Sequence, residues 1–423
     1  MQNLHYKTFL TGLLVLGFFT TDFLFAQTDS TTVKPSFSIS GYVDTYYFTN
    51  LNMPSSRDNM GQSGVGRGFD RRVDQFQLGM VQTILKYTTS KTEVVADLVF
   101  GPSGVYGNYG NVPTSLGSTP SYYGTPLAND AISALLIKQA YIKYNATKRL
   151  SFTLGQFSTH IGYEYIESPL NFFYSINHTF NSGIPFYHQG LKAQYALSDK
   201  LSVMVGITNG FDHIHDNNRS KAFTAQVAFI PFEGMSSYFN YFISNEENAD
   251  SLGNTPQGYF SVYDFNGTYT VNDKFSVGYW FMLGSQKGLQ GGMGTFAPTS
   301  GDMNKVETWG GGNLYFMYKY SDMFSLGLRT EYFDNTSGAR GIRNYDRSSG
   351  VVRAVGTDCY TLTLTGNIYL DGGNLILRPE LRYDQFGKLD GAANTESQQF
   401  MDSAGKFTKN TQTTIGLAAI YKF

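Results

Sequence analysis

The chain has little of what would cross-link it, charge it strongly or carry it through a bilayer as helices. Cys359 is the only cysteine, so neither an intramolecular disulfide nor a multi-cysteine metal site can form. Lysine and arginine total 31 against 33 acidic residues, and the formal net charge of −2 argues against a nucleic-acid partner. Beyond residue 26, no segment reaches the apolar length of a membrane helix.

The N-terminus carries the one long apolar run, at residues 9–19, shortly after Lys7. This run is too short to span a bilayer and is typical of a secretory signal, with a cleavage site after Ala26. We predict a signal peptide at residues 1–26, a short periplasmic segment at 27–36 and a single barrel domain at 37–423.

The chain is rich in aromatic residues and in alternating apolar and polar runs. Aromatics reach 16%, with 31 Tyr and 34 Phe against 2 Trp. The runs are joined alternately by short turns, such as the one after Asn272, and by long loops rich in Gly, Asn, Ser and Tyr. This rhythm predicts an all-β fold, a transmembrane antiparallel β-barrel of about sixteen strands with short periplasmic turns and long extracellular loops.

Charges gather on one face of several predicted strands. In segment 374–384, Leu377 and Leu381 alternate with arginines and carboxylates. A lipid-facing Arg or Lys at the bilayer midplane costs about 2–4 kcal/mol, so the charged face must line a wet interior. The residues predicted to line the pore are Glu93, Asp97, Lys192, Arg329, Glu331, Arg378, Glu380, Arg382 and Asp384.

Two predicted strands, 72–87 and 134–144, do not alternate cleanly. Gln82 interrupts the apolar face of the first and Lys138 that of the second. A β-bulge would reset each face, but the sequence does not say where it lies.

The loop 159–187 differs from the others because it is rich in aromatic residues. We predict that it folds into the barrel and narrows the pore; packing on the outer surface or against a partner is the alternative. The residues predicted to form this constriction are Tyr163, Glu164, Glu167, Phe172 and Tyr174. The two glutamates could also act as an acid–base pair, but no nucleophile accompanies them, so we predict no enzymatic activity.

Other candidate motifs are weak. His213 and His215, flanked by aspartates, could bind a divalent metal, but no further ligand can be assigned, so neither a metal nor a cofactor is predicted. The glycine-rich stretch 61–68 lacks the spacing of a phosphate-binding loop and is predicted to be a flexible loop.

Two short segments carry a family resemblance. Leu154-Gly155-Gln156-Phe157 leads into Ile161-Gly162-Tyr163-Glu164, and the last strand alternates from Ile415 to a terminal Phe423. With the strand rhythm, these segments resemble the "putative β-barrel porin" family of Gram-negative outer membranes and, more distantly, the phosphate-selective porins.

The resemblance implies an outer-membrane location and passive diffusion of small hydrophilic solutes. It also implies contact with membrane lipid and with the barrel-insertion machinery through Phe423. Phosphate selectivity does not carry over, because loop 159–187 contains no Lys or Arg. Porins of this size are often homotrimers, and the oligomeric state stays open. The alternative function is a barrel scaffold whose outer loops bind a surface or partner.

Overall fold

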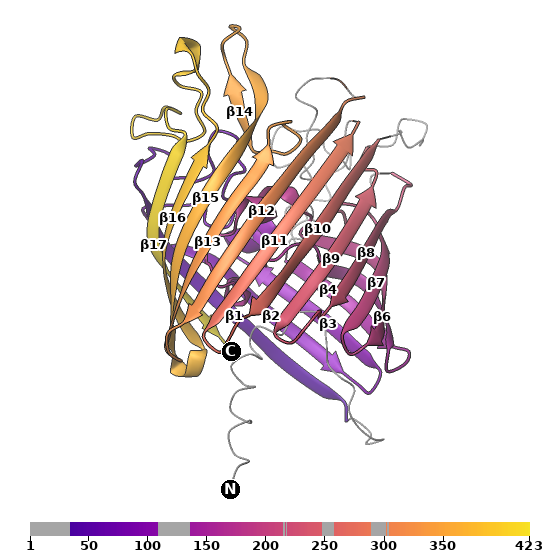
Figure 1. Cartoon of the computed structure of the whole chain (residues 1–423). Helices are drawn as coiled ribbons and strands as arrows, with labels where there is room; N and C mark the ends of the chain where they lie inside the picture. Colours follow the sequence, from indigo (N-terminus) through magenta and orange to yellow (C-terminus); the bar gives the residue numbers. More distant parts are fainter. Residues whose placement is uncertain are drawn as a thin grey trace.

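The computed structural model describes residues 34–108, 136–214, 216, 218–247, 258–288, 302 and 304–423. These residues form an all-β protein in which sixteen antiparallel strands close into a barrel, so the predicted fold class is confirmed (Figure 1). The predicted signal peptide lies outside the described residues. No helix in the described part of the chain is long and apolar enough to cross a membrane.

Each strand of the wall pairs with its neighbours in chain order. The wall strands are β1 (Ser36–Asn50), β2 (Gln77–Thr88), β3 (Thr92–Phe100), β4 (Ile137–Asn145), β5 (Leu150–Ser158), β6 (Tyr187–Ser198), β7 (Leu201–Thr208), β8 (Ala222–Phe229), β9 (Met235–Ser244), β10 (Tyr259–Thr270), β11 (Phe275–Lys287), β12 (Val306–Lys319), β13 (Phe324–Asn335), β15 (Arg353–Leu370), β16 (Leu375–Phe386) and β17 (Thr411–Lys422). A further short strand, β14 (Arg343–Asp346), pairs with the outer part of β15 and forms a hairpin that rises above the wall (Figure 1).

The first and last strands close the barrel. β1 pairs with β17 from Tyr42–Lys422 to Asn50–Thr414. The ladder extends to the last residue, because Gly41 and Phe423 each donate their N–H to the other's carbonyl oxygen at 3.0 Å. Hydrocarbon cannot satisfy unpaired backbone groups, so this closure is what allows the sheet to span a bilayer.

Side chains at the short turns explain why similar turn sequences recur. Between β10 and β11, the Asn272 side-chain oxygen accepts the N–H groups of Lys274 at 2.9 Å and Phe275 at 3.0 Å. Between β12 and β13, the Ser321 hydroxyl accepts the N–H of Phe324 at 3.1 Å. Asn and Ser that accept an N–H two or three residues ahead stabilise tight turns. Such short connections mark the periplasmic end of a bacterial barrel.

The two strands whose sequences do not alternate cleanly between apolar and polar residues each contain a bulge. The register of β2 against β1 shifts near Asp44, and that of β4 against β3 shifts at Lys138. The bulge turns Lys138 inward, where its ammonium lies 2.6 Å from the Glu167 carboxylate. Gln82 also faces the interior and donates to Asp97 at 2.9 Å. Both residues that interrupted the apolar pattern are therefore interior residues.

Alternation along β16 separates an outer face from an inner one. Leu381 and Tyr383 point outward and are 41% and 38% exposed, whereas Arg382 between them is fully buried. Because a charge facing lipid is costly, this burial places the charged face on the barrel interior.

Candidate pore and the loop inside it

The long loop between β5 and β6 lies inside the barrel (Figure 1). It contains a 3₁₀ turn at Ser168–Leu170 and the short helix α4 (His178–Gly183). The Asn177 side chain caps α4 by accepting the Phe180 N–H at 2.7 Å, and it donates to the Tyr315 hydroxyl of β12 at 2.8 Å. One asparagine therefore both starts the helix and attaches it to the wall.

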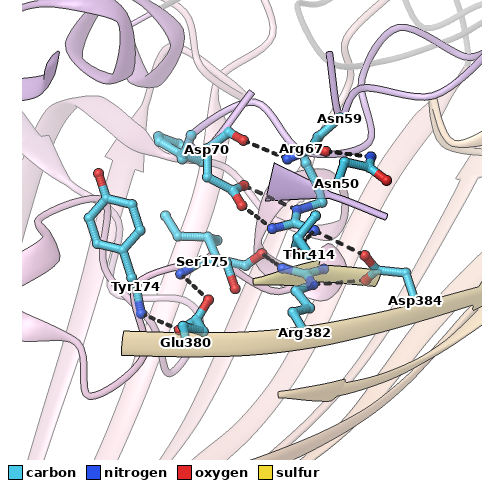
Figure 2. Close-up of polar contacts among 12 residues, drawn as sticks. Asn50, Asn59, Arg67, Asp70, Tyr174, Ser175, Glu380, Arg382, Asp384 and Thr414 are labelled. Atoms are coloured by element: carbon cyan, nitrogen blue, oxygen red, sulfur yellow. Dashed lines mark hydrogen bonds and ion pairs between the residues drawn. The ribbon is translucent and has the colours of Figure 1, made fainter. Parts of the chain in front are cut away.

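Wall carboxylates accept backbone N–H groups of this loop. Glu380 of β16 accepts those of Tyr174 at 2.8 Å and Ser175 at 3.0 Å, as Figure 2 shows. Glu331 of β13 accepts the N–H of Thr179 at 2.7 Å and its hydroxyl at 2.8 Å. These charge-assisted hydrogen bonds replace the strand-to-strand backbone hydrogen bonds that an irregular segment lacks.

Wall arginines donate to carbonyl oxygens of the same loop. Arg329 of β13 reaches the Ser175 carbonyl at 2.6 Å, and Arg382 of β16 reaches that of Ile176 at 2.6 Å. Arg378 of β16 donates to the carbonyl of the first residue of the 3₁₀ turn at 2.8 Å. Carboxylates and arginines of the wall thus satisfy both kinds of backbone group in the loop, which lets irregular backbone lie at membrane depth.

The same charges also neutralise one another. Arg329 lies 2.7 Å from Glu164 of the loop. Asp384 of β16 lies 2.8 Å from Arg382 and 3.1 Å from the His178 ring. All five side chains are buried. Removing a charge from water costs several kcal/mol, so these pairings are what makes their burial tolerable.

A second insertion comes from the loop between β1 and β2. Arg67 of this loop forms an ion pair with Asp70 and lies 3.2 Å from Asp384 (Figure 2). At Gly68, a Cβ atom would lie 2.0 Å from the Tyr106 ring, so the packing requires glycine. The prediction of a flexible loop is therefore wrong for the end of the glycine-rich stretch, which is buried in the interior. No local pattern marks Arg67 as a partner of a residue near the C-terminus.

The aromatic residues predicted to form the constriction pack against the wall. Tyr163 stacks on Tyr315 with ring centroids 4.3 Å apart. Tyr174 stacks on Phe48 of β1 with ring centroids 5.7 Å apart. Phe172 packs over a glycine of β13. Apolar burial therefore accompanies the polar anchors and helps to fix the loop against the wall.

The nine residues predicted to line the pore fall into two groups. Seven are buried within the interior, namely Asp97, Arg329, Glu331, Arg378, Glu380, Arg382 and Asp384. The other two, Glu93 of β3 and Lys192 of β6, keep partial exposure. Glu93 lies 2.6 Å from the Lys86 ammonium, and the Lys192 ammonium lies 4.4 Å from the centre of the inward-facing Phe157 ring.

The candidate metal ligands have other contacts. The His213 ring lies 3.1 Å from the Glu246 carboxylate, and Asp212 accepts the N–H of Phe186 at 2.6 Å. Burial lowers the pKa of His213, but the hydrogen bond and charge of Glu246 more than offset it, so the pKa lies above its usual value. His215 lies outside the described residues. Among the residues that the structure describes, no group of three His, Cys, Asp or Glu side chains could hold a metal ion.

An arginine from an outer loop is buried against the in-folded loop. Arg340, between β13 and β14, donates to the Ser182 carbonyl of α4 at 2.6 Å. Its guanidinium lies 5.0 to 5.2 Å from the ring centres of Phe211, Phe260 and Trp309. No pattern in the sequence marks this contact, which joins an outer loop to the in-folded loop.

A closed barrel with an apolar outside, a charged interior and an in-folded loop defines a porin-type protein of the bacterial outer membrane. Residues 36–423 match the model of the family described as putative beta-barrel porin-2, OmpL-like, and the chain belongs to this family.

Solved structures with a similar fold include three outer-membrane proteins. They are the channel DcaP of Acinetobacter baumannii (12% identity, TM-score 0.53, 94% of this chain and 100% of that chain covered), an anion-selective porin from Comamonas acidovorans (9%, 0.54, 92% and 100%) and OmpT of Vibrio cholerae (12%, 0.51, 94% and 99%). At such identities the likeness shows the fold alone. No curated protein matches the chain.

Proposed function

We propose that this porin lets small hydrophilic solutes and ions diffuse passively through the part of the lumen that the in-folded loop leaves open. The observation that carries the proposal is a charged interior in which some inward side chains keep contact with water. The loop is held by side chains of β4, β12, β13 and β16, whereas inward residues of β2 and β3 are partly exposed. The Lys86 side chain is 42% exposed and that of Glu93 is 15% exposed. Family membership and the similar folds of a channel and an anion-selective porin support this function.

The in-folded loop sets the size limit in this proposal. Buried charge pairs and backbone bonds hold it in place, so the free cross-section is the part of the lumen that it leaves open. The wall arginines and carboxylates near it hold the loop rather than contact solutes. Glu164 and Glu167, each in a buried ion pair with a wall residue, are structural in this view, and we propose no enzymatic activity.

Conductance of the refolded protein in planar bilayers tests the proposal. Discrete channels are expected, and a deletion within 165–185 should raise their conductance by removing the loop's anchors. A matched control deletes residues 348–352 at the exposed tip near β14 and should leave conductance unchanged. A correctly folded barrel that forms no channels would refute the proposal.

A binding scaffold is the second candidate, because inward residues at the outer ends of several strands are buried. Thr208 of β7, Glu307 of β12 and Asn335 of β13 lie near the outer ends of their strands and are buried. Pull-down of a stable complex by the folded protein, together with an absence of channels, would favour this function.

We also propose that the barrel contacts outer-membrane lipid and that the insertion machinery recognises Phe423, whose side chain is exposed. A homotrimer is a further proposal, which light scattering of the detergent-solubilised protein tests directly.

A further inference from the structure

A row of five aromatic rings crosses the interior of the barrel. Tyr106 contacts Phe69 with ring centroids 5.0 Å apart, and Phe69 contacts Phe186 at 5.7 Å. Phe186 stacks on Phe180 of α4 at 5.4 Å, and Phe180 meets Trp280 of β11 at 6.5 Å. Rings whose centres lie at such distances are in contact, so the row is continuous.

The two ends of the row lie on opposite sides of the barrel. Tyr106 belongs to the short helix α2 (Pro102–Gly107), which packs on the wall, because a Cβ atom at Gly104 would lie 3.2 Å from Val99 of β3. Trp280 at the other end is a fully buried residue of β11. Eight strand-to-strand steps separate β3 from β11 in either direction around the wall. The row therefore spans the lumen.

The ring of Phe69 lies where two insertions into the barrel meet. It belongs to the loop between β1 and β2. Asn181 of α4 donates to the Val65 carbonyl of this loop at 2.6 Å, and the Ser103 hydroxyl of α2 donates to the Phe69 carbonyl at 3.0 Å. The β1–β2 loop is therefore held between α2 and the in-folded loop.

The surroundings of the row are apolar. All of its rings except that of Tyr106 are at most 6% exposed. Ile166 and Ile184 of the in-folded loop are buried in the same apolar cluster. Moving an ion from water into such surroundings is strongly unfavourable unless a partner charge or hydrogen bonds compensate it. An apolar constriction can therefore exclude ions by excluding water, without any charged filter.

We propose that this aromatic row is an apolar partition that bars ions and hydrophilic solutes from the middle of the lumen, and that Phe69 and Phe186 are the residues at which the two insertions close it. The proposal rests on the channel function proposed above. It goes further because it assigns part of the size limit to the loop between β1 and β2, rather than to loop 159–187 alone. A solute that crosses the barrel must then pass beside the row.

Single-channel conductance in planar bilayers tests the proposal. Phe69→Asn with Phe186→Asn places polar side chains where the insertions meet and should raise the conductance by admitting water. Phe69→Leu with Phe186→Leu introduces side chains of the same branched shape as asparagine, but they are apolar, so the conductance should rise much less. The control Phe76→Asn changes a phenylalanine of the same β1–β2 loop that is 84% exposed, and should leave the conductance unchanged.

Two measures keep the comparison valid. Heat-modifiable migration in electrophoresis shows whether each variant is folded. Phe69→Asn alone changes only a loop residue outside the barrel wall, and the same rise in conductance is expected of it if the double variant does not fold.

The outcomes separate the partition from the channel function. Wild-type channels whose conductance the asparagine variants leave unchanged, or the leucine variant raises equally, would overturn the partition and leave the channel function intact. Channels that form only in the asparagine variants would support the partition and overturn the channel function of the wild-type protein. Folded wild-type and variant proteins that all lack channels would overturn both proposals.

Discussion

Replacing Glu380 by glutamine should release the in-folded loop without changing the shape of the side chain. One carboxylate oxygen accepts the Tyr174 N–H at 2.8 Å and the Thr365 hydroxyl at 2.7 Å, and the other accepts the Ser175 N–H at 3.0 Å. Glutamine replaces one of these oxygens by an NH₂ group, so one loop N–H faces a donor instead of an acceptor.

The size of the effect follows from these contacts. A hydrogen bond to a charged group contributes about 1.5–3 kcal/mol, and a buried donor left without a partner costs about 1–3 kcal/mol. We therefore expect Glu380→Gln to destabilise the anchored loop by about 3 kcal/mol. Each 1.4 kcal/mol is about a factor of ten in an equilibrium constant, so the released state should become about a hundredfold more populated.

Single-channel recording gives the decisive measurement. Glu380→Gln should show a larger fraction of time in a high-conductance state than wild type. The control Asp322→Asn changes an exposed carboxylate in a periplasmic turn and should behave as wild type. If folded Glu380→Gln matched wild type in both conductance and open fraction, the reasoning that this carboxylate holds the loop would be refuted.

Three further predictions concern Arg340, an outer loop and the C-terminus. Arg340→Leu removes the bond to α4 and the contacts with three rings, and should destabilise the folded protein by about 2 kcal/mol in denaturant unfolding; Arg340→Lys should lose less, and equal stability of Arg340→Leu and wild type would contradict this contact. His213 has a raised pKa, so its pairing with Glu246 stabilises the outer loop below about pH 6.5 and is lost as pH rises through the folded-state pKa. Hydrogen exchange in this loop should therefore speed up with pH beyond its intrinsic dependence, and His213→Gln should remove that excess; an excess that persisted in the variant would assign it elsewhere. Phe423→Ala keeps the backbone bonds to Gly41 but loses the aromatic ring, so lower assembly into the outer membrane, rescued by Phe423→Tyr, would identify the ring as the insertion signal, whereas normal assembly would exclude it.

Sequence alone predicted the barrel wall because lipid imposes a simple rule on it. Each strand must show apolar residues outward, so alternation along β16 and the charges on its other face were enough to place Arg378 and Arg382 inside. The sequence did not predict the orientation of residues at which this rule has exceptions. Lys138 appeared to break the pattern, because a one-residue bulge is decided by its contact with Glu167 rather than by any local signal.

The interior was harder to predict, because its partners come from distant parts of the chain. The aromatic content of the loop after β5 suggested that it leaves solvent, yet nothing in the sequence showed which wall would receive it. The Arg67–Asp384 pair joins residues 317 positions apart, and only the closed barrel brings them together. A charge in a glycine-rich loop has no distinctive pattern, so such a contact can be found only in the folded structure.

Arginine and lysine have different roles in the interior. Arginine presents five donors in a planar fork, which suits it to holding carbonyl and carboxylate oxygens in place, and Arg329 and Arg382 do so beneath the loop. Lysine keeps a mobile, hydrated charge, and the Lys86 side chain is 42% exposed. If the loop is held by its buried anchors and the ion preference is set by exposed charges, Glu380→Gln should change the open fraction without changing the ion preference. A variant that changed both properties would show that the anchors and the exposed charges act as one unit.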